Sequence, residues 1–487
     1  MLTAALVLTV LLPAVGGLVA SVLTARPARV MAMCAVLLAA IAGSWCIVAV
    51  FPGTHHGVVA DLPWLGQAIG SGLIGILLDP LSSVLLIIVL VIGVLTILYS
   101  LSYVSEGNRD HAVAARDQGR YYLWMLLFVT SMAGVAVSPN FLQLFLFWEL
   151  TTVCSWALIS FYRNETSLRA GFKALIMTHA GGLFFLLALL TIFAQTGSFE
   201  FRALTQLSSA SRVWVFCCLM IAAWGKAAQV PLHTWLPDAM EAPTPVSAYL
   251  HAAAMVKAGV YLMARSVGAG WAMPPGVAYL SGAMAILTIF IALSYYFVQD
   301  DLKRLLAYST IAHLGYVLLG VALGALGSVE GYRGGVLHIV CHGFSKALLF
   351  FCVGAVAYVT GTRSIAALRG LGRSMPLTAT AFFVGVLAVT GIPPFACFWS
   401  KFMLLAGALR MPGSLGPILL VLLLSETLVA FAWMLYIGQR VFLGAPSAAA
   451  QVNSDPPLTM RVTLVALMIG SVIAPVIGIP LVELIGG

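Results

Sequence analysis

The stretch LHIVCHGFSKALLF, residues 337–350, places three ionisable side chains in an otherwise apolar segment. These residues, His338, His342 and Lys346, follow one another at intervals of four. Because each residue of an α-helix turns by ~100°, all three would lie within an arc of ~80° on one side of a helix. Two chemistries suit the pattern: a metal site of the His-x3-His kind, to which Cys341 could contribute, or a line of groups that exchange protons.

The proton line is the better interpretation of this stretch. Lys346, protonated one turn beyond His342, would repel a divalent cation, and no carboxylate is near in the sequence. The eight cysteines lie in or beside apolar segments and lack the paired spacing of a disulfide framework or an iron–sulfur motif. No phosphate-binding, dinucleotide-binding or haem-attachment motif occurs either. We therefore expect no metal and no other cofactor.

Other ionisable residues also lie in apolar surroundings. A lysine in the middle of a bilayer costs ~2.5–3.5 kcal/mol unless partners or water compensate for it. A single group of this kind often only fixes the packing of two helices, but a large set favours proton transfer, because buried Lys changes its protonation while Arg stays charged. The set comprises Lys226, Lys257, Lys346 and Lys401, with Glu149 and Glu426, and with His179, His251, His313, His338 and His342 within or near apolar runs.

The elements that carry these residues must be membrane spans. The chain is 62% hydrophobic and 8% charged, whereas roughly a quarter of the residues of a soluble protein are charged. Apolar runs long enough to cross ~30 Å of hydrocarbon recur along the whole chain and leave no room for a soluble domain. We predict an all-α polytopic membrane protein with about fourteen transmembrane helices, at roughly 2–24, 29–51, 73–103, 121–138, 140–162, 171–195, 213–236, 245–265, 274–297, 303–325, 333–360, 377–405, 415–440 and 459–484.

Two of these spans contain helix breakers. Pro231 follows Lys226 by five residues in the seventh span, and the sequence TGIPP, with Pro393 and Pro394, interrupts the twelfth. Proline frees a backbone carbonyl, which is tolerated at membrane depth only where protein or water can satisfy it. We predict that helices 7 and 12 are discontinuous and mark an ion path. Because they are five spans apart they run in opposite directions, as an inverted five-helix repeat requires.

The basic residues predict the orientation. The odd-numbered connections between spans hold fifteen Arg and Lys residues, and the even-numbered ones hold five. The positive-inside rule then places both termini on the non-cytoplasmic side of a multi-pass protein of the cell (inner) membrane. This asymmetry accounts for the net charge of +8, so the lipid bilayer is the expected environment and no nucleic-acid partner is needed.

Four stretches carry a family resemblance. They are KAAQVPLHTWLPDAMEAPTPVSAYLHAAAMVKAGVYLMAR (226–265), DLKRLLAYSTIAHLGY (301–316), HGFSKALLFF (342–351) and GIPPFACFWSKF (391–402). Together they resemble the antiporter-like subunits of respiratory complex I, Mrp antiporters and membrane-bound hydrogenases, and the resemblance covers nearly the whole chain. Within that group the chain is most similar to component D of hydrogenase-4, a complex of the formate-hydrogenlyase type.

The resemblance implies an organisation into two inverted repeats, each holding half of a proton path. Helices 1–3 would occupy residues 1–120, and helix 14 would occupy 459–487. The first repeat, helices 4–8, would span 121–265, and the second, helices 9–13, would span 274–440.

The resemblance also implies roles for single residues. Glu149 would pair with Lys226, and Lys257 and Lys346 would connect the two halves. Lys401 would stand next to the exit. We expect His251, His338 and His342 to relay protons between them, and we regard His179, His313 and Glu426 as possible additions to the path. His313 stands where relatives commonly have Gln, which leaves open whether it titrates or only forms hydrogen bonds.

These observations lead to one functional hypothesis and two alternatives. The chain would be a proton-translocating subunit of a multisubunit redox complex of the hydrogenase-4 type, with no redox centre of its own, so whether it counts as an enzyme is left open. Its partners would be other membrane subunits of a hydrogenase or a complex I-like assembly. The alternatives are a subunit of an NADH–quinone oxidoreductase or of an Mrp-type Na⁺/H⁺ antiporter, and a purely structural membrane anchor.

Overall fold

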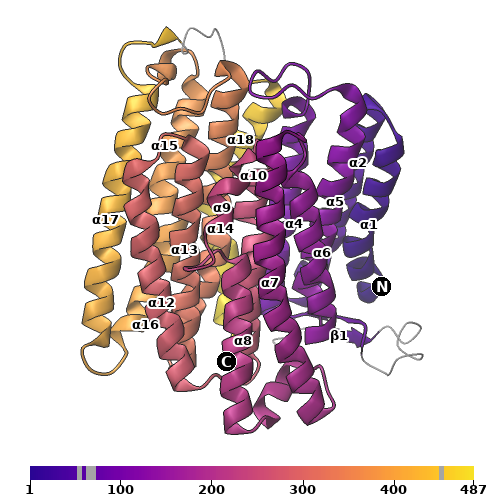
Figure 1. The fold of residues 1–487 in the computed structure, drawn as a ribbon, viewed down its shortest axis with the longest axis vertical. Coiled ribbons are helices and arrows are strands. Elements are labelled where there is room, and N and C mark those ends of the chain that lie inside the picture. The colour runs from indigo at the N-terminus through magenta and orange to yellow at the C-terminus, as the bar shows by residue number, and fades with distance from the viewer. Residues whose placement is uncertain (52–57, 62–72, 449–454, 487) are drawn as a thin grey trace.

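The computed structural model describes residues 1–51, 58–61, 73–448 and 455–486, and long helices run side by side through it (Figure 1). Twelve helical stretches among these residues are long and apolar enough to cross a membrane, which confirms a polytopic membrane protein. They are α1 (Leu2–Val22), α2 (Ala25–Val50), α4 (Pro80–Tyr103), α5 (Ala115–Val137), α6 (Phe141–Ile159), α7 (Glu165–Thr196), α10 with α11 (Thr244–Ala252, Met255–Gly268), α12 (Pro275–Ser294), α13 (Leu302–Ala325), α14 (Val329–Thr360), α17 (Leu415–Phe442) and α18 (Leu458–Glu483).

In the predicted third span, 73–103, the first residues form a strand rather than a helix. The strands β1 (Val58–Asp61) and β2 (Gly75–Leu78) pair as an antiparallel hairpin, and α4 begins only at Pro80. Asp79 caps this helix, since its carboxylate accepts a hydrogen bond of 2.7 Å from the Ser82 amide, and proline suits the first helical position. An apolar run alone could not distinguish the strand from the helix that follows it.

The predicted seventh span, 213–236, is broken as expected but earlier than Pro231. Helix α8 (Ser209–Lys226) ends at Lys226, and the chain continues through turns into the short helices α9 (Trp235–Asp238) and η2 (Ala239–Glu241). Pro231 lacks the N–H that would continue the helix. The Trp235 indole instead donates a hydrogen bond of 2.9 Å to the carbonyl of Gly225, which satisfies one carbonyl near the end of α8.

The predicted twelfth span, 377–405, consists of α15 (Pro376–Thr390) and α16 (Ala396–Leu409). The break lies at Pro393 and Pro394, the residues that predict it. Gly391 adopts a left-handed conformation at φ 88°, which a glycine accepts without steric cost.

A third break was not predicted. The helix over 245–265 is divided into α10 and α11 at Ala253 and Ala254, neither of which is helical. No proline or glycine stands there, and a run of alanines predicts a continuous helix. The break places Lys257 in the first turn of α11, where the surrounding protein buries it completely.

Helix α14 forms the centre of the bundle, and α1, α2 and α17 lie at its edges (Figure 1). The apolar window of α14 is entirely buried, as is that of α10 with α11. Glycines allow close contact here, because a Cβ atom at Gly407 of α16 would collide with the backbone of Gly331 of α14. His338, His342 and Lys346 of α14 therefore lie inside the protein rather than against lipid.

Both chain ends lie at the same end of the bundle, whereas the connections 104–114 and 361–375 lie at the opposite end (Figure 1). These connections contain Arg109 and three arginines of the 361–375 loop. The arrangement therefore separates the termini from these basic connections by the length of the helices.

Candidate functional site

The three ionisable side chains of the stretch LHIVCHGFSKALLF lie along one side of α14. His338, His342 and Lys346 are all at most 1% exposed. Their hydrogen-bond partners lie on α11, α13 and α16, so the three side chains connect α14 to three neighbouring helices.

Lys257 and His342 are in direct contact at the centre of the molecule. The Lys257 ammonium nitrogen lies 2.8 Å from His342 Nδ1, which joins α11 to α14. An ammonium group only donates hydrogen bonds, so the imidazole nitrogen accepts when Lys257 is protonated. This contact has the geometry that a direct proton transfer requires.

Three imidazoles form a cluster next to this contact. His313 Nδ1 of α13 lies 2.9 Å from His338 Nε2, and the two rings are nearly parallel. The ring centre of His313 is 5.0 Å from that of His342, and His338 Nδ1 lies 2.8 Å from the hydroxyl of Ser400. A hydrogen bond between two imidazoles needs one donor and one acceptor, so their protonation states depend on each other.

The cluster does not have the arrangement of a metal site. In the part of the chain that the structure describes, no group of three or more His, Cys, Asp or Glu side chains could hold a metal ion. The interval of four on α14 separates His338 and His342 by a ring-centre distance of 5.9 Å, and each nitrogen that has a partner faces Ser400, His313 or Lys257.

Lys401 lies at one end of the polar line, beside a carboxylate from α17. Its ammonium nitrogen is 3.9 Å from Glu426 Oε2 and 4.7 Å from the ring centre of Tyr316. The Tyr316 hydroxyl donates a hydrogen bond to Glu426, which is completely buried. Glu426 is thus an immediate neighbour of Lys401, and Tyr316 is a member of the site that the search for ionic residues overlooked.

Lys226 lies at the other end, and the pair with Glu149 that the resemblance implied is not formed here. The Lys226 ammonium donates hydrogen bonds to the Trp148 carbonyl and the Thr151 hydroxyl, and lies 4.3 Å from the centre of the Trp148 ring. Glu149 instead contacts His179 of α7, with 2.8 Å between Oε2 and Nδ1.

The reason lies on α6 and α7. Lys226 reaches a backbone carbonyl and a hydroxyl of α6, while the carboxylate of Glu149 points toward α7, where Gly182 leaves room for it. The His179 side chain is 55% exposed and that of Glu149 is 24% exposed, so this pair lies at the edge of the bundle.

Two further predicted residues lack direct contact with the line. His251 is fully buried against the Phe350 ring, and neither of its nitrogens has a hydrogen-bond partner among the described residues. Lys346 donates a hydrogen bond of 3.1 Å to the carbonyl of Leu306. The charged groups around His251 include Lys346 and Lys257. Bridging water would therefore be needed to include His251 in a proton path.

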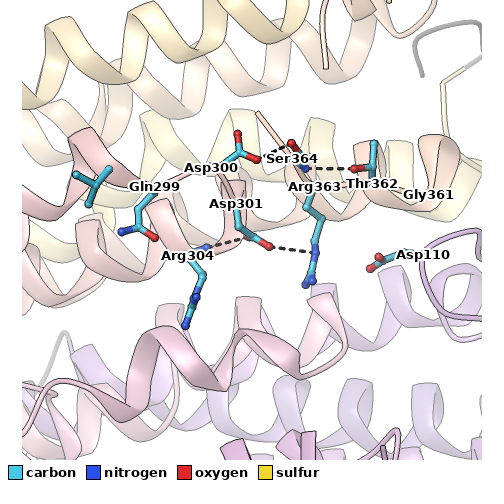
Figure 2. Close-up of a pocket in the computed structure, with 10 residues that line it drawn as sticks. Asp110, Gln299, Asp300, Asp301, Arg304, Gly361, Thr362, Arg363 and Ser364 are labelled. Atoms are coloured by element: carbon cyan, nitrogen blue, oxygen red, sulfur yellow. Dashed lines mark hydrogen bonds and ion pairs between the residues drawn. The ribbon is translucent and has the colours of Figure 1, made fainter. Parts of the chain in front are cut away.

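A fifth buried lysine, Lys303, stands at the start of the predicted span 303–325 and was counted among the basic residues of the connection before it, so its burial was not expected. Lys303 is 1% exposed, and its ammonium donates hydrogen bonds to the carbonyls of Met240 and Ala242 at 2.8 and 2.6 Å. Asp301, two residues before Lys303, helps line a polar pocket of about 510 Å³ at the end of the bundle that bears the 361–375 connection. Figure 2 shows its ion pair with Arg363.

Comparison with known sequences finds two family models that match this chain. The profile described as "NADH:quinone oxidoreductase/Mrp antiporter, TM" matches residues 138–431. A second profile, "NADH-Ubiquinone oxidoreductase (complex I), chain 5 N-terminus", matches residues 71–112. The first match includes every residue of the polar line from Lys226 to Lys401.

Curated relatives include NAD(P)H-quinone oxidoreductase subunit 5 of chloroplasts. The chain is 39% identical over 350 residues to that of Carpenteria californica, which covers 67% of this chain and 45% of the relative. The chain is 37% identical over 386 residues to the protein of Chara vulgaris, and this match covers 75% of this chain and 56% of the relative. The chain thus spans about half the length of these relatives.

Two solved structures share the fold. The Mrp complex from Dietzia sp. DQ12-45-1b contains a chain with a TM-score of 0.82 and 30% identity, and the match covers 99% of this chain and 51% of that one. A chain of the membrane-bound sulfane sulfur reductase, an archaeal respiratory membrane complex, has a TM-score of 0.85 over 99% of this chain and 96% of its own. Its identity of 24% supports the fold alone.

Proposed function

Because the chain belongs to the NADH:quinone oxidoreductase/Mrp antiporter transmembrane family, we propose that it is an antiporter-like subunit of a multisubunit membrane complex and moves protons along its buried Lys, His and Glu residues. The observation that carries this proposal is the 2.8 Å contact between Lys257 and His342. It joins two ionisable side chains in the fully buried centre of a membrane protein, where an ionic group is retained at a cost.

The proposed route runs from Lys226 to Lys401. Lys257 contacts His342 directly, and His313, His338 and the Ser400 hydroxyl form a second run of direct contacts that reaches α16, which carries Lys401. His342 Nε2 has no hydrogen-bond partner among the described residues, so water would bridge His342 to the pair of His313 and His338. No contact between the described residues links Lys226 to Lys257, so water would bridge this interval. Proton transfer would use the direct contacts within each of these two runs and water between them.

Glu149 would regulate proton transfer at the end of the line where Lys226 lies. Its carboxylate now faces His179, and an approach to Lys226 would favour the charged form of that lysine by Coulomb attraction. Return of Glu149 to His179 would remove this attraction and favour release of the proton toward Lys257. The energy for the movement would come from neighbouring subunits.

The organisation into fourteen helices remains part of the proposal. Twelve apolar stretches, with α8 leading the seventh helix and α15 and α16 forming the twelfth, support this number. We further propose two inverted repeats over 121–265 and 274–440, and both termini on the non-cytoplasmic side of the cell (inner) membrane. The common location of the two chain ends and the basic connections opposite them support that orientation (Figure 1).

The parent complex is proposed to be of the hydrogenase-4 type, on the wording of the four quoted stretches. The relatives named above are subunits of NAD(P)H-quinone oxidoreductases and chains of Mrp and sulfur-reducing complexes, so these assemblies are the alternatives. Replacing Na⁺ by K⁺ in a vesicle assay separates an Na⁺/H⁺ antiporter from a proton-only path. A structural anchor predicts that single lysine substitutions abolish assembly.

Lys226→Ala tests the proposed function in the assembled complex reconstituted into vesicles. Removing an essential proton-transfer group should lower proton translocation at least about tenfold while substrate turnover of the complex remains measurable. Lys173→Ala is the matched control, because Lys173 is a partly exposed lysine paired with Asp238 and lies away from the line. Normal proton translocation at full turnover in the Lys226 variant would refute the assignment.

A further inference from the structure

A second polar pocket lies where α18 begins, at the end of the bundle that bears the 104–114 connection (Figure 1). It has a volume of about 470 Å³, and its wall combines the 104–114 connection, the end of α14 and the start of α18. Arg109 lines it from the connection, Tyr358 from α14 and Arg461 from α18. The proposed proton line uses none of these residues.

The two arginines carry positive charge that no carboxylate of the described residues balances. Both residues are exposed, and neither forms an ion pair within the described part of the chain. Arg109 Nη1 donates a hydrogen bond of 3.0 Å to the Val359 carbonyl, which holds the guanidinium at the wall of the pocket. Because a guanidinium has five N–H donors, both arginines keep donors for a ligand.

The pocket also contains an acidic residue, Asp455, whose carboxylate is engaged elsewhere. It accepts hydrogen bonds of 3.1 Å from the amides of Leu377 and Thr378 and one of 2.8 Å from the Thr378 hydroxyl. These donors belong to the first turn of α15, where a carboxylate satisfies amides that have no helical partner. Asp455 thus caps α15 and leaves the arginines available to an external anion.

Exposed apolar side chains continue from the pocket along α18. Leu458, Val462, Val465 and Ile469 are between 39% and 66% exposed. Their spacing places them within an arc of about 60° on one side of the helix, and Arg461 lies about 40° beyond the edge of this stripe. A basic group at the end of a membrane helix with an apolar stripe beside it matches a phospholipid, which carries its charge at the interface and its acyl chains below it.

We propose that this pocket binds the phosphate headgroup of an anionic phospholipid such as phosphatidylglycerol, with an acyl chain along the exposed stripe of α18. Guanidinium groups bind phosphate through paired hydrogen bonds, and basic pockets between membrane helices hold anionic headgroups. Inorganic phosphate could use the arginines but not the stripe, so the two features together favour a lipid. The proposed orientation places the pocket at the cytoplasmic leaflet, whose anionic lipids attract basic residues.

The test compares two lipid probes on the assembled complex in phosphatidylcholine nanodiscs. One is phosphatidylglycerol with a photoactivatable diazirine in an acyl chain, and the other is the matching phosphatidylcholine. Mass spectrometry locates the labelled residues after illumination. The phosphatidylglycerol probe should label residues 458–469 at least about tenfold more than the phosphatidylcholine probe, because only its headgroup has a net negative charge that two arginines can bind.

Arg109→Gln combined with Arg461→Gln should abolish this preference. If the double variant does not assemble, Arg461→Gln alone carries the test and should reduce the preference at least about threefold, since the Arg461 side chain has no ion-pair partner to lose among the described residues. Arg116→Gln combined with Arg440→Gln is the matched control. It removes the same charge from two exposed arginines that do not line the pocket, and it should keep the preference.

Equal labelling of residues 458–469 by the two probes in the parent complex would overturn the site, as would a preference that survives in the Arg109 and Arg461 variant. If inorganic phosphate removed the preference of the parent, the pocket would bind a soluble anion and the lipid assignment would be wrong. Each of these results would leave the proposed proton path intact, because that path is judged by proton translocation in the Lys226 variant.

Discussion

His313 lies at a branch of the polar line. Its ring contacts His338 through a hydrogen bond and stacks on Tyr316, whose hydroxyl reaches Glu426. These contacts need a hydrogen-bonding group at position 313, but none of them needs that group to change its charge. A neutral amide could serve the same purpose, as would the Gln that the family resemblance implies at this position.

His313→Gln should therefore keep most of the proton translocation, while His313→Leu should reduce it at least about tenfold, since only leucine removes the partner of His338. Proton translocation per substrate turned over, measured in vesicles containing the assembled complex, separates the two variants. Equal loss in both would show that His313 itself carries a proton.

Some contacts of single residues could not be predicted from the sequence. The types and the spacing of His338, His342 and Lys346 indicated a buried line, and they lie on one buried side of α14. The partner of Lys257 and the neighbour of Lys401 come from helices far away in the sequence. Glu149 was assigned to Lys226 by resemblance, yet in this structure its carboxylate faces α7 and contacts His179.

At the scale of elements, the close packing of α14 against α16 keeps the imidazole cluster beside Ser400 and Lys401. The packing depends on Gly407, since a Cβ atom there would overlap with backbone atoms of Gly331 and Glu330, which cannot move away as a flexible side chain could. Any larger residue must separate the two helices.

Gly407→Ala should destabilise the protein by about 1–3 kcal/mol, the usual cost of overpacking. Gly276→Ala in α12 is the matched control, because nothing lies within 4 Å of a Cβ atom added there. Thermal unfolding of both variants in detergent measures the difference. A Gly407 variant as stable as the Gly276 variant would contradict the proposed role of this contact.

The breaks show how far local sequence predicts an element. Pro231, Pro393 and Pro394 predicted two interruptions because proline cannot donate the helical hydrogen bond. The division between α10 and α11 carries no such residue, so tertiary packing rather than local propensity must hold Ala253 and Ala254 outside the helical conformation. The hairpin before α4 was missed because its second strand is as apolar as the span that follows.

At the scale of the whole molecule, composition was enough to predict a multi-pass membrane protein, since few charged residues and long apolar runs fit only that class. The polar line was predicted only in outline. It depends on α11, α13, α14, α16 and α17 meeting around one axis, and such long-range packing is not encoded in any single stretch.

The central claim is that protons pass between Lys257 and His342, and His342→Leu tests it most directly. The variant removes the acceptor of a 2.8 Å contact while keeping an apolar side chain of moderate size in the core. His111→Gln is the control, because His111 lies in the connection between α4 and α5, outside the membrane helices. The measurement is the number of protons translocated per substrate turned over by the reconstituted complex.

We predict that the His342 variant assembles and turns over substrate but translocates protons at least about tenfold less efficiently, whereas the His111 control matches the parent. An unchanged number of protons per turnover in an assembled His342→Leu complex would contradict the account.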